Sequence, residues 1–143
     1  MARVKANGIE IEYEAVGNKN DPALLLVMGL GAQLTIWPDL LFKGLADRGF
    51  HVIRYDNRDT GLSSDFGSWG LPNIPAAVMK AMRGERPDAP YVLSDMAADA
   101  IGLLDVLGIE RAHMVGASMG GMIVQIAAAL YAARARSMVS IYS

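Results

Sequence analysis

Residues 23–28 (ALLLVM) are apolar at every position, and this short run constrains the fold more than any other part of the sequence. A strand with one exposed face alternates apolar and polar residues, whereas an uninterrupted apolar strand needs cover on both faces. The run is far shorter than the ~20 residues that cross a membrane. It therefore predicts a buried strand of a parallel sheet with helices on both sides.

Strands and helices alternate along the rest of the chain. Residues 3–6 and 9–16 predict an antiparallel hairpin, because Asn7-Gly8 between them tolerates the positive φ angles of a type I′ turn. The glutamates of its second strand are expected on the exposed face. Further predictions are strands over 51–55, 112–115 and 138–142, and helices over 35–48, 94–107 and 119–134 with Thr35 and Ser94 as N-caps. This order indicates an α/β fold in which a hairpin leads into a mostly parallel sheet with flanking helices.

Composition narrows the classes of function. The formal net charge is −2, and a nearly neutral chain argues against binding to nucleic acid or to an acidic membrane surface. There is no cysteine, which excludes disulfides and thiolate ligands, and two histidines are too few for most metal centres. The first 20 residues are rich in charge and lack the apolar core of a signal peptide. We expect a single domain over residues 1–143, a cytoplasmic location, and neither metal nor cofactor.

The segment Gly116-Ala117-Ser118-Met119-Gly120 fits the pattern G-x-S-x-G at the junction of a predicted strand and a predicted helix. This placement is that of a nucleophile elbow, in which a sharp turn lifts the serine hydroxyl above the sheet. Gly116 and Gly120 would let strand and helix approach closely, and the helix N-terminus favours a developing negative charge. Ser118 is the predicted nucleophile. The alternative is an ordinary glycine-rich turn in which Ser118 caps the helix.

A second glycine-rich turn, Met28-Gly29-Leu30-Gly31, follows the apolar strand. The carboxyl ends of parallel strands meet at one edge of a sheet, which is where ligands bind. The turn is therefore expected beside Ser118. There the backbone N–H groups of Leu30 and Met119 would form an oxyanion hole. The alternative is a connector without a role in chemistry.

A long irregular stretch holds four of the six prolines: Pro72, Pro75, Pro87 and Pro90. Long loops in compact domains are often functional, so we predict a lid-like or pocket-lining insertion over residues 62–93, with a short helix over 76–82. Trp37 and Trp69 are candidates for lining an acyl pocket, and ordinary packing is the alternative.

The chain resembles the α/β-hydrolase superfamily and is most similar to bacterial esterase-type members of the aclacinomycin methylesterase group. Four stretches in family order carry the resemblance: LLLVMGLG, HVIRYDNRDTGLS, LSDMAADAIGLLDVLG and AHMVGASMGGMIVQ. Two positions depart from the pattern. Met28 stands where many members have His, and residues 131–136 replace the usual His-Pro-x-Arg turn. The resemblance implies the α/β-hydrolase fold, of which this chain matches the N-terminal half.

The resemblance also implies a Ser–His–acid triad in which the acid and the His follow the nucleophile helix. Only one helix and one strand are predicted after Ser118, so we expect both partners beyond Ser143. The two histidines are poor substitutes because both open their strands, at the wrong edge of the sheet. His113 would lie about 16 Å from Ser118 at ~3.3 Å per strand residue, and His51 opens its strand in the same way. Asp56 and Asp59 are interpreted as turn-forming or Arg-paired residues.

The leading hypothesis is a serine hydrolase that acts on small-molecule carboxylic esters through an acyl-enzyme on Ser118, and that is weakly active or inactive as this chain alone. A second hypothesis is a non-catalytic module that dimerises, or binds a complementary C-terminal half, through its exposed last strand. A third keeps the fold and changes the reaction to perhydrolysis or C–C bond hydrolysis, since a fold does not determine a reaction.

Overall fold

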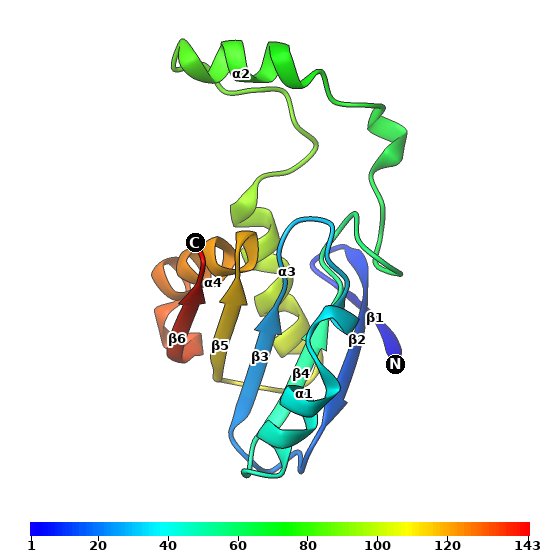
Figure 1. Ribbon diagram of the computed structural model, residues 1–143, viewed down its shortest axis with the longest axis vertical. Helices are drawn as coiled ribbons and strands as arrows, with labels where there is room; N and C mark the ends of the chain where they lie inside the picture. The colour runs from blue at the N-terminus through cyan, green and yellow to red at the C-terminus, as the bar shows by residue number, and fades with distance from the viewer.

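The computed structural model describes residues 1–143, which form one six-stranded sheet in the order β1-β2-β4-β3-β5-β6 (Figure 1). The strands are β1 (Ala2–Ala6), β2 (Ile9–Val16), β3 (Ala23–Val27), β4 (His51–Tyr55), β5 (Ala112–Ala117) and β6 (Ala135–Ile141). Strand β2 pairs antiparallel with β1 and β4, and all other pairs are parallel. The predicted hairpin and mostly parallel sheet are confirmed.

Four helices accompany the sheet. They are α1 (Asp39–Ala46), α2 (Ile74–Met82), α3 (Leu93–Val106) and α4 (Met119–Leu130), with short 3₁₀ turns at Leu34–Ile36, Gly67–Trp69 and Ala132–Arg134. Three of them, α1, α3 and α4, cover the two faces of the sheet. Figure 1 shows α1 on one side of the sheet and α3 with α4 on the other. No helix of the structure is both long and apolar enough to span a bilayer.

The two-sided cover explains the apolar run of β3. Leu25 and Val27 pack into the larger core with residues of α3 and α4. Leu24 and Leu26 point the other way, into a smaller core that contains Phe42 of α1. All five residues of β3 are buried, so a polar side chain at any of them would lose contact with water.

The predicted exposure of the glutamate face of β2 is wrong at Glu12. Asn7 (φ 48°) and Gly8 (φ 80°) do form the tight turn of the hairpin. Glu12, however, is only 6% exposed. The segment after β4 folds over this part of β2: the Glu12 amide donates to Ser63 Oγ at 3.0 Å, and the Asp56 amide donates to the Glu12 carbonyl oxygen at 3.0 Å.

Several predicted boundaries also shift. Thr35 lies inside a 3₁₀ turn and α1 begins later, at Asp39. Helix α3 begins at Leu93, and the carboxylate that caps it belongs to Asp95, which accepts from the Val92 amide at 2.8 Å. Helix α4 ends at Leu130 instead of continuing to residue 134, and β6 starts at Ala135, three residues before the predicted strand.

The stretch 62–93 begins and ends on the body of the molecule, where Ser63 is hydrogen-bonded to β2 and Leu93 packs against the larger core, and it leaves the body in between (Figure 1). Figure 1 shows α2 standing well away from the sheet, with long connections on either side. No residue of α2 is buried, and exposed apolar side chains occur along the stretch, including Trp69, Leu71, Ile74, Val78, Met79 and Met82. This part of the chain is called the insertion below.

Candidate active site

Ser118 occupies a strained turn between β5 and α4. Its backbone has φ 55° and ψ −126°, a conformation that costs a non-glycine residue ~1–3 kcal/mol. The turn is held by its own backbone: the Ser118 amide donates to the Ile141 carbonyl at 2.8 Å, and the Gly121 amide donates to the Ser118 carbonyl at 2.8 Å. The hydroxyl accepts no helix amide, so Ser118 does not cap α4 through its side chain.

Glycines on either side of Ser118 are required by close backbone contacts. A Cβ on Gly116 would overlap the carbonyl oxygen of Gly120, and a Cβ on Gly120 would overlap the carbonyl oxygen of Val27 in β3. The backbones of β5, α4 and β3 therefore meet with no room for side chains. The turn geometry follows from this packing and not from the serine alone.

The glycine-rich turn after β3 lies directly against Ser118. A Cβ on Gly29 would be 3.0 Å from Ser118 Cβ and 3.3 Å from Ser118 Oγ. Asn57 holds this turn from the other side, since its Nδ2 donates to the Met28 carbonyl oxygen at 2.8 Å. The backbone amides of Leu30 and Met119 donate to no protein acceptor. Two free amides thus belong to the two turns that meet at Ser118.

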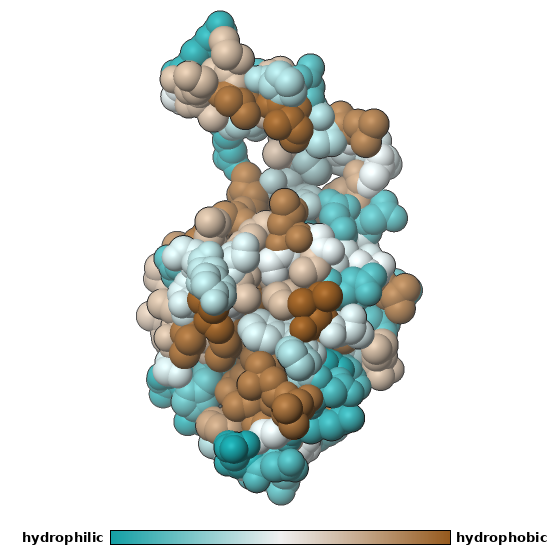
Figure 2. Space-filling model, in the orientation of Figure 1, coloured by the Kyte–Doolittle hydropathy of each residue, from teal (hydrophilic) through white to brown (hydrophobic).

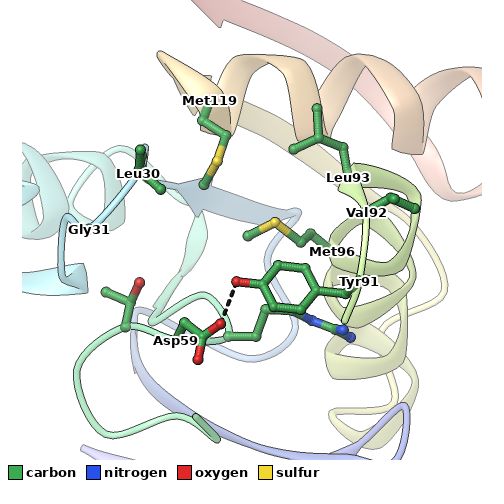
Figure 3. A pocket seen from close by; sticks show the side chains of 10 residues that line it. Leu30, Gly31, Asp59, Tyr91, Val92, Leu93, Met96 and Met119 are labelled. Carbon is green, nitrogen blue, oxygen red and sulfur yellow. Dashed lines mark hydrogen bonds between the residues drawn. The ribbon is translucent and has the colours of Figure 1, made fainter. Parts of the chain in front are cut away.

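A cavity of about 270 Å³ adjoins these two turns (Figure 3). Leu30 and Met119 contribute side chains at one end, and Met96 of α3 contributes its thioether in the middle. The other end is polar. There the Tyr91 hydroxyl donates to Asp59 Oδ2 at 2.5 Å. Burial, followed by the bond to Asp59, raises the pKa of the Tyr91 hydroxyl to about 12. The full lining is Leu30, Gly31, Arg58, Asp59, Thr60, Tyr91, Val92, Leu93, Met96 and Met119.

The turn after β4 has the structural role expected for it. The Asp56 carboxylate accepts from the Leu34 amide at 2.7 Å and from the Leu62 amide at 3.1 Å. Arg58 pairs with Asp99 of α3 through two 2.7 Å hydrogen bonds, and both side chains are buried. Asp99 and Tyr91 were not singled out by sequence reasoning. No local spacing pattern could have indicated them, because each meets its partner across more than 30 residues of chain.

The remaining candidates lie away from Ser118. His113 Nδ1 is 2.8 Å from Ser137 Oγ, and His51, which opens β4, is buried at 7% exposure. Trp37 packs in the smaller core, which is the packing alternative for this residue. Trp69 is 66% exposed and lines a second cavity, which the insertion forms together with Asp59. No group of three or more His, Cys, Asp or Glu side chains is arranged to hold a metal ion.

Comparison with known proteins places the chain among hydrolases. A family model for the alpha/beta hydrolase fold matches residues 22–143. Rhodomycin D methylesterase DauP of Streptomyces sp. (strain C5) is 36% identical over 80% of this chain and 33% of its own length. The 3-oxoadipate enol-lactonase 2 of Acinetobacter baylyi is 31% identical over 82% of this chain and 35% of its own length.

Solved structures agree with this result. The enol-lactonase of Burkholderia xenovorans LB400 superposes with a TM-score of 0.74 at 30% sequence identity. The superposition covers 96% of this chain and 45% of the enol-lactonase chain. Epoxide hydrolase A of Mycobacterium thermoresistibile has a TM-score of 0.74 at 28% identity, over 96% of this chain and 37% of its own. The chain spans about a third of the length of the curated relatives it matches.

Proposed function

The chain belongs to the alpha/beta hydrolase fold family, and on that premise we propose that it carries the nucleophile and oxyanion hole of a serine hydrolase. The observation that supports this most is the strained turn at Ser118, packed against a second turn with a free amide. Strain at a single residue commonly marks a functional site. The names of two relatives, a methylesterase and an enol-lactonase, favour carboxylic esters of small molecules as the substrate class.

The proposed chemistry proceeds through an acyl-enzyme. Ser118 Oγ attacks the ester carbonyl carbon, and the carbonyl oxygen takes the negative charge of the tetrahedral intermediate. The N–H groups of Leu30 and Met119 donate to that oxygen, helped by the positive N-terminal end of α4. Collapse of the intermediate breaks the bond to the alkoxy oxygen, which leaves as the alcohol once protonated. Water then hydrolyses the acyl-serine and restores Ser118.

The proton of Ser118 needs a base within about 3 Å. His113 opens β5 and engages Ser137, while His51 opens β4 in the core, so each stands at the edge of the sheet opposite to the Ser118 turn. We therefore assign neither as the base and propose that the base and the acid of the triad are not among these 143 residues. On this proposal the chain alone hydrolyses esters slowly, through the oxyanion hole and binding.

A fluorophosphonate probe tests the assignment of the nucleophile. Such a probe phosphonylates an activated serine and expels fluoride, which intact mass detects as one adduct. We expect slow labelling of one site, lost in Ser118→Ala. The matched control is Ser137→Ala, which removes the serine that contacts a histidine and should leave labelling unchanged. Labelling that persists in Ser118→Ala would overturn the assignment of the nucleophile. Fast ester turnover by the wild type that is abolished in Ser118→Ala would overturn the proposal that the base is not among these residues.

A second candidate function is an assembly module, favoured by the open edge of β6. This strand pairs only with β5, and Met138 and Val139 on it are 40% and 49% exposed. Unpaired apolar strand edges associate with other chains. A homodimer, or a complex with a complementary half, would cover this edge. Light scattering at high protein concentration tests it: a dimer that Val139→Lys converts to a monomer supports the module, and a wild-type monomer contradicts the homodimer.

A further inference from the structure

Two cavities of the molecule share one wall. The smaller cavity, of about 270 Å³, is lined by Leu30 and Met119 of the two turns but not by Ser118 itself. A larger one of about 590 Å³ is formed by the insertion together with Asp59, and Asp59 and Tyr91 line both cavities. The larger cavity carries aromatic and proline side chains, among them Phe66, Trp69 and Pro90. Figure 3 shows the Tyr91 hydroxyl directed at Asp59 in the smaller cavity, whose lining also includes Met96 and Met119.

The shared wall is held in place from several directions. Asp59 sits in a left-handed backbone conformation (φ 58°), and its Oδ1 accepts from the Phe66 amide at 2.6 Å. The guanidinium of Arg58 lies 4.8 Å from the centre of the Tyr91 ring. Arg58 is itself fixed by its buried pair with Asp99. Because each group is restrained by another, the Tyr91 ring has a defined position between the two cavities.

The surfaces on both sides of this wall suit neutral, apolar ligands. Six of the ten residues around the smaller cavity and five of the twelve around the larger one are hydrophobic. In the larger one, the ring of Trp69 is 66% exposed and offers a face on which a ligand ring can stack, while the rings of Phe66 and Tyr91 contact each other edge to face with centroids 5.2 Å apart. The carboxylate of Asp59, present in both, already accepts hydrogen bonds from Tyr91 and Phe66. Recognition beyond the reacting group therefore depends on apolar contact.

We propose that Tyr91 partitions a single two-compartment ligand site and thereby sets how long an apolar ligand can be. With the Tyr91–Asp59 bond closed, a compact group is confined to the smaller compartment. With it open, an elongated neutral ligand extends from the Ser118 turn into the aromatic compartment under the insertion. The inference rests on the proposed function in one respect only, namely which end of the ligand carries the reacting carbonyl. The partition itself does not require chemistry at Ser118.

Binding of two unreactive alcohols to the full 143-residue chain tests the partition. Benzyl alcohol has one ring, and 4-phenylbenzyl alcohol has two in line. Calorimetry gives both affinities, and the emission of Trp69, which lines only the larger compartment, reports entry there. In the wild type we expect similar affinities for the two alcohols and little change in Trp69 emission.

Opening the wall should change the ratio of these affinities. Tyr91→Ala should raise the preference for the two-ring alcohol about tenfold, because a second ring becomes buried. It should also make Trp69 emission respond to that alcohol, and Trp69→Phe should remove the response. Tyr91→Phe, which keeps the ring and removes the bond to Asp59, should give a smaller rise of about threefold.

The outcomes separate cleanly. The proposal is overturned if folded Tyr91→Ala keeps the wild-type ratio, or if the ratio rises without a Trp69 response. It is also overturned if the wild type already binds the two-ring alcohol with a Trp69 response. Should Tyr91→Ala fail to fold by circular dichroism, an unchanged ratio in Tyr91→Phe has the same consequence. Because neither alcohol reacts, these results are independent of labelling at Ser118.

Discussion

The Ser118 turn and the insertion differ in what holds them. At the turn, the backbones of three elements meet so closely that Gly116 and Gly120 admit no Cβ. In the insertion, α2 buries no residue, and Leu71 is 99% exposed. Figure 2 shows brown apolar side chains on the insertion facing the gap above the body. One region is defined by steric contact in the core, and the other is held at its base only.

This difference separates two requirements of the proposed site. Stabilising an oxyanion needs amides fixed to within fractions of an ångström, which close backbone packing provides. Selecting a ligand tolerates a wall that opens, and the hydrogen bond between Tyr91 and Asp59 is the contact that closes the wall here. Arg58 and Asp99 join the two regions, because their ion pair lies beneath Tyr91 and inside the body. Away from this ion pair, mutations can weaken one region and leave the other intact.

The largest effect is expected at Asp99. Asp99→Ala leaves the Arg58 guanidinium buried without its partner and removes an acceptor from Asn7, which should lower the free energy of unfolding by about 3–5 kcal/mol. Urea denaturation measures it. The control is Asp88→Ala in the insertion, which removes an ion pair with Lys80. The Asp88 side chain is 88% exposed, so this loss should lower the free energy of unfolding by less than about 1 kcal/mol. Equal losses in the two variants would contradict the comparison.

An intermediate effect is expected at Gly120. Gly120→Ala places a Cβ against the Val27 carbonyl, and we expect a loss of about 2–3 kcal/mol in the free energy of unfolding. Gly44→Ala is the matched control, since Gly44 lies in α1 with only Arg48 nearby, at 3.5 Å. An alanine there should stabilise the protein by about 0.5–1 kcal/mol because helical glycine is entropically unfavourable. The same sign in both variants would refute the steric account of the turn.

The smallest effect concerns pH. Burial and the bond to Asp59 raise the pKa of Tyr91 to about 12 in the folded protein, from 10.0. The neutral phenol is therefore favoured by folding, and its contribution is complete below pH 10 and is lost as the pH rises toward 12. Absorbance at 295 nm follows phenolate formation. The difference between the titrations of wild type and Tyr91→Phe should have its midpoint near pH 12; a midpoint near 10 would show that the wall is open in solution.

Elements whose signals are local were predicted well. The hairpin at Asn7-Gly8 and the strand-to-helix junction at Ser118 match the structure, and the predicted buried strand over 23–28 is present over Ala23–Val27. Positions that depend on remote neighbours were predicted poorly. Thr35 and Ser94 are good N-caps by residue type, yet α1 begins at Asp39, after the 3₁₀ turn that contains Thr35, and α3 begins at Leu93, where the Asp95 carboxylate accepts from the Val92 amide. Glu12 fits the alternating pattern of a strand with one exposed face, but the chain near Ser63 covers it.

The residues of the candidate site also fall into a group with local sequence signals and a group without them. Ser118, Met119 and Leu30 were predictable as candidates because two glycine-rich turns follow strands that run side by side, and parallel strands end at one edge. The sequence by itself made this meeting possible, since a side chain at Gly116 or Gly120 would block the close approach of the backbones. Only the tertiary structure decided what surrounds it. Tyr91 meets Asp59 across 32 residues, and Asp99 meets Arg58 across 41, so their contacts arise from chain return and burial, which no local pattern encodes.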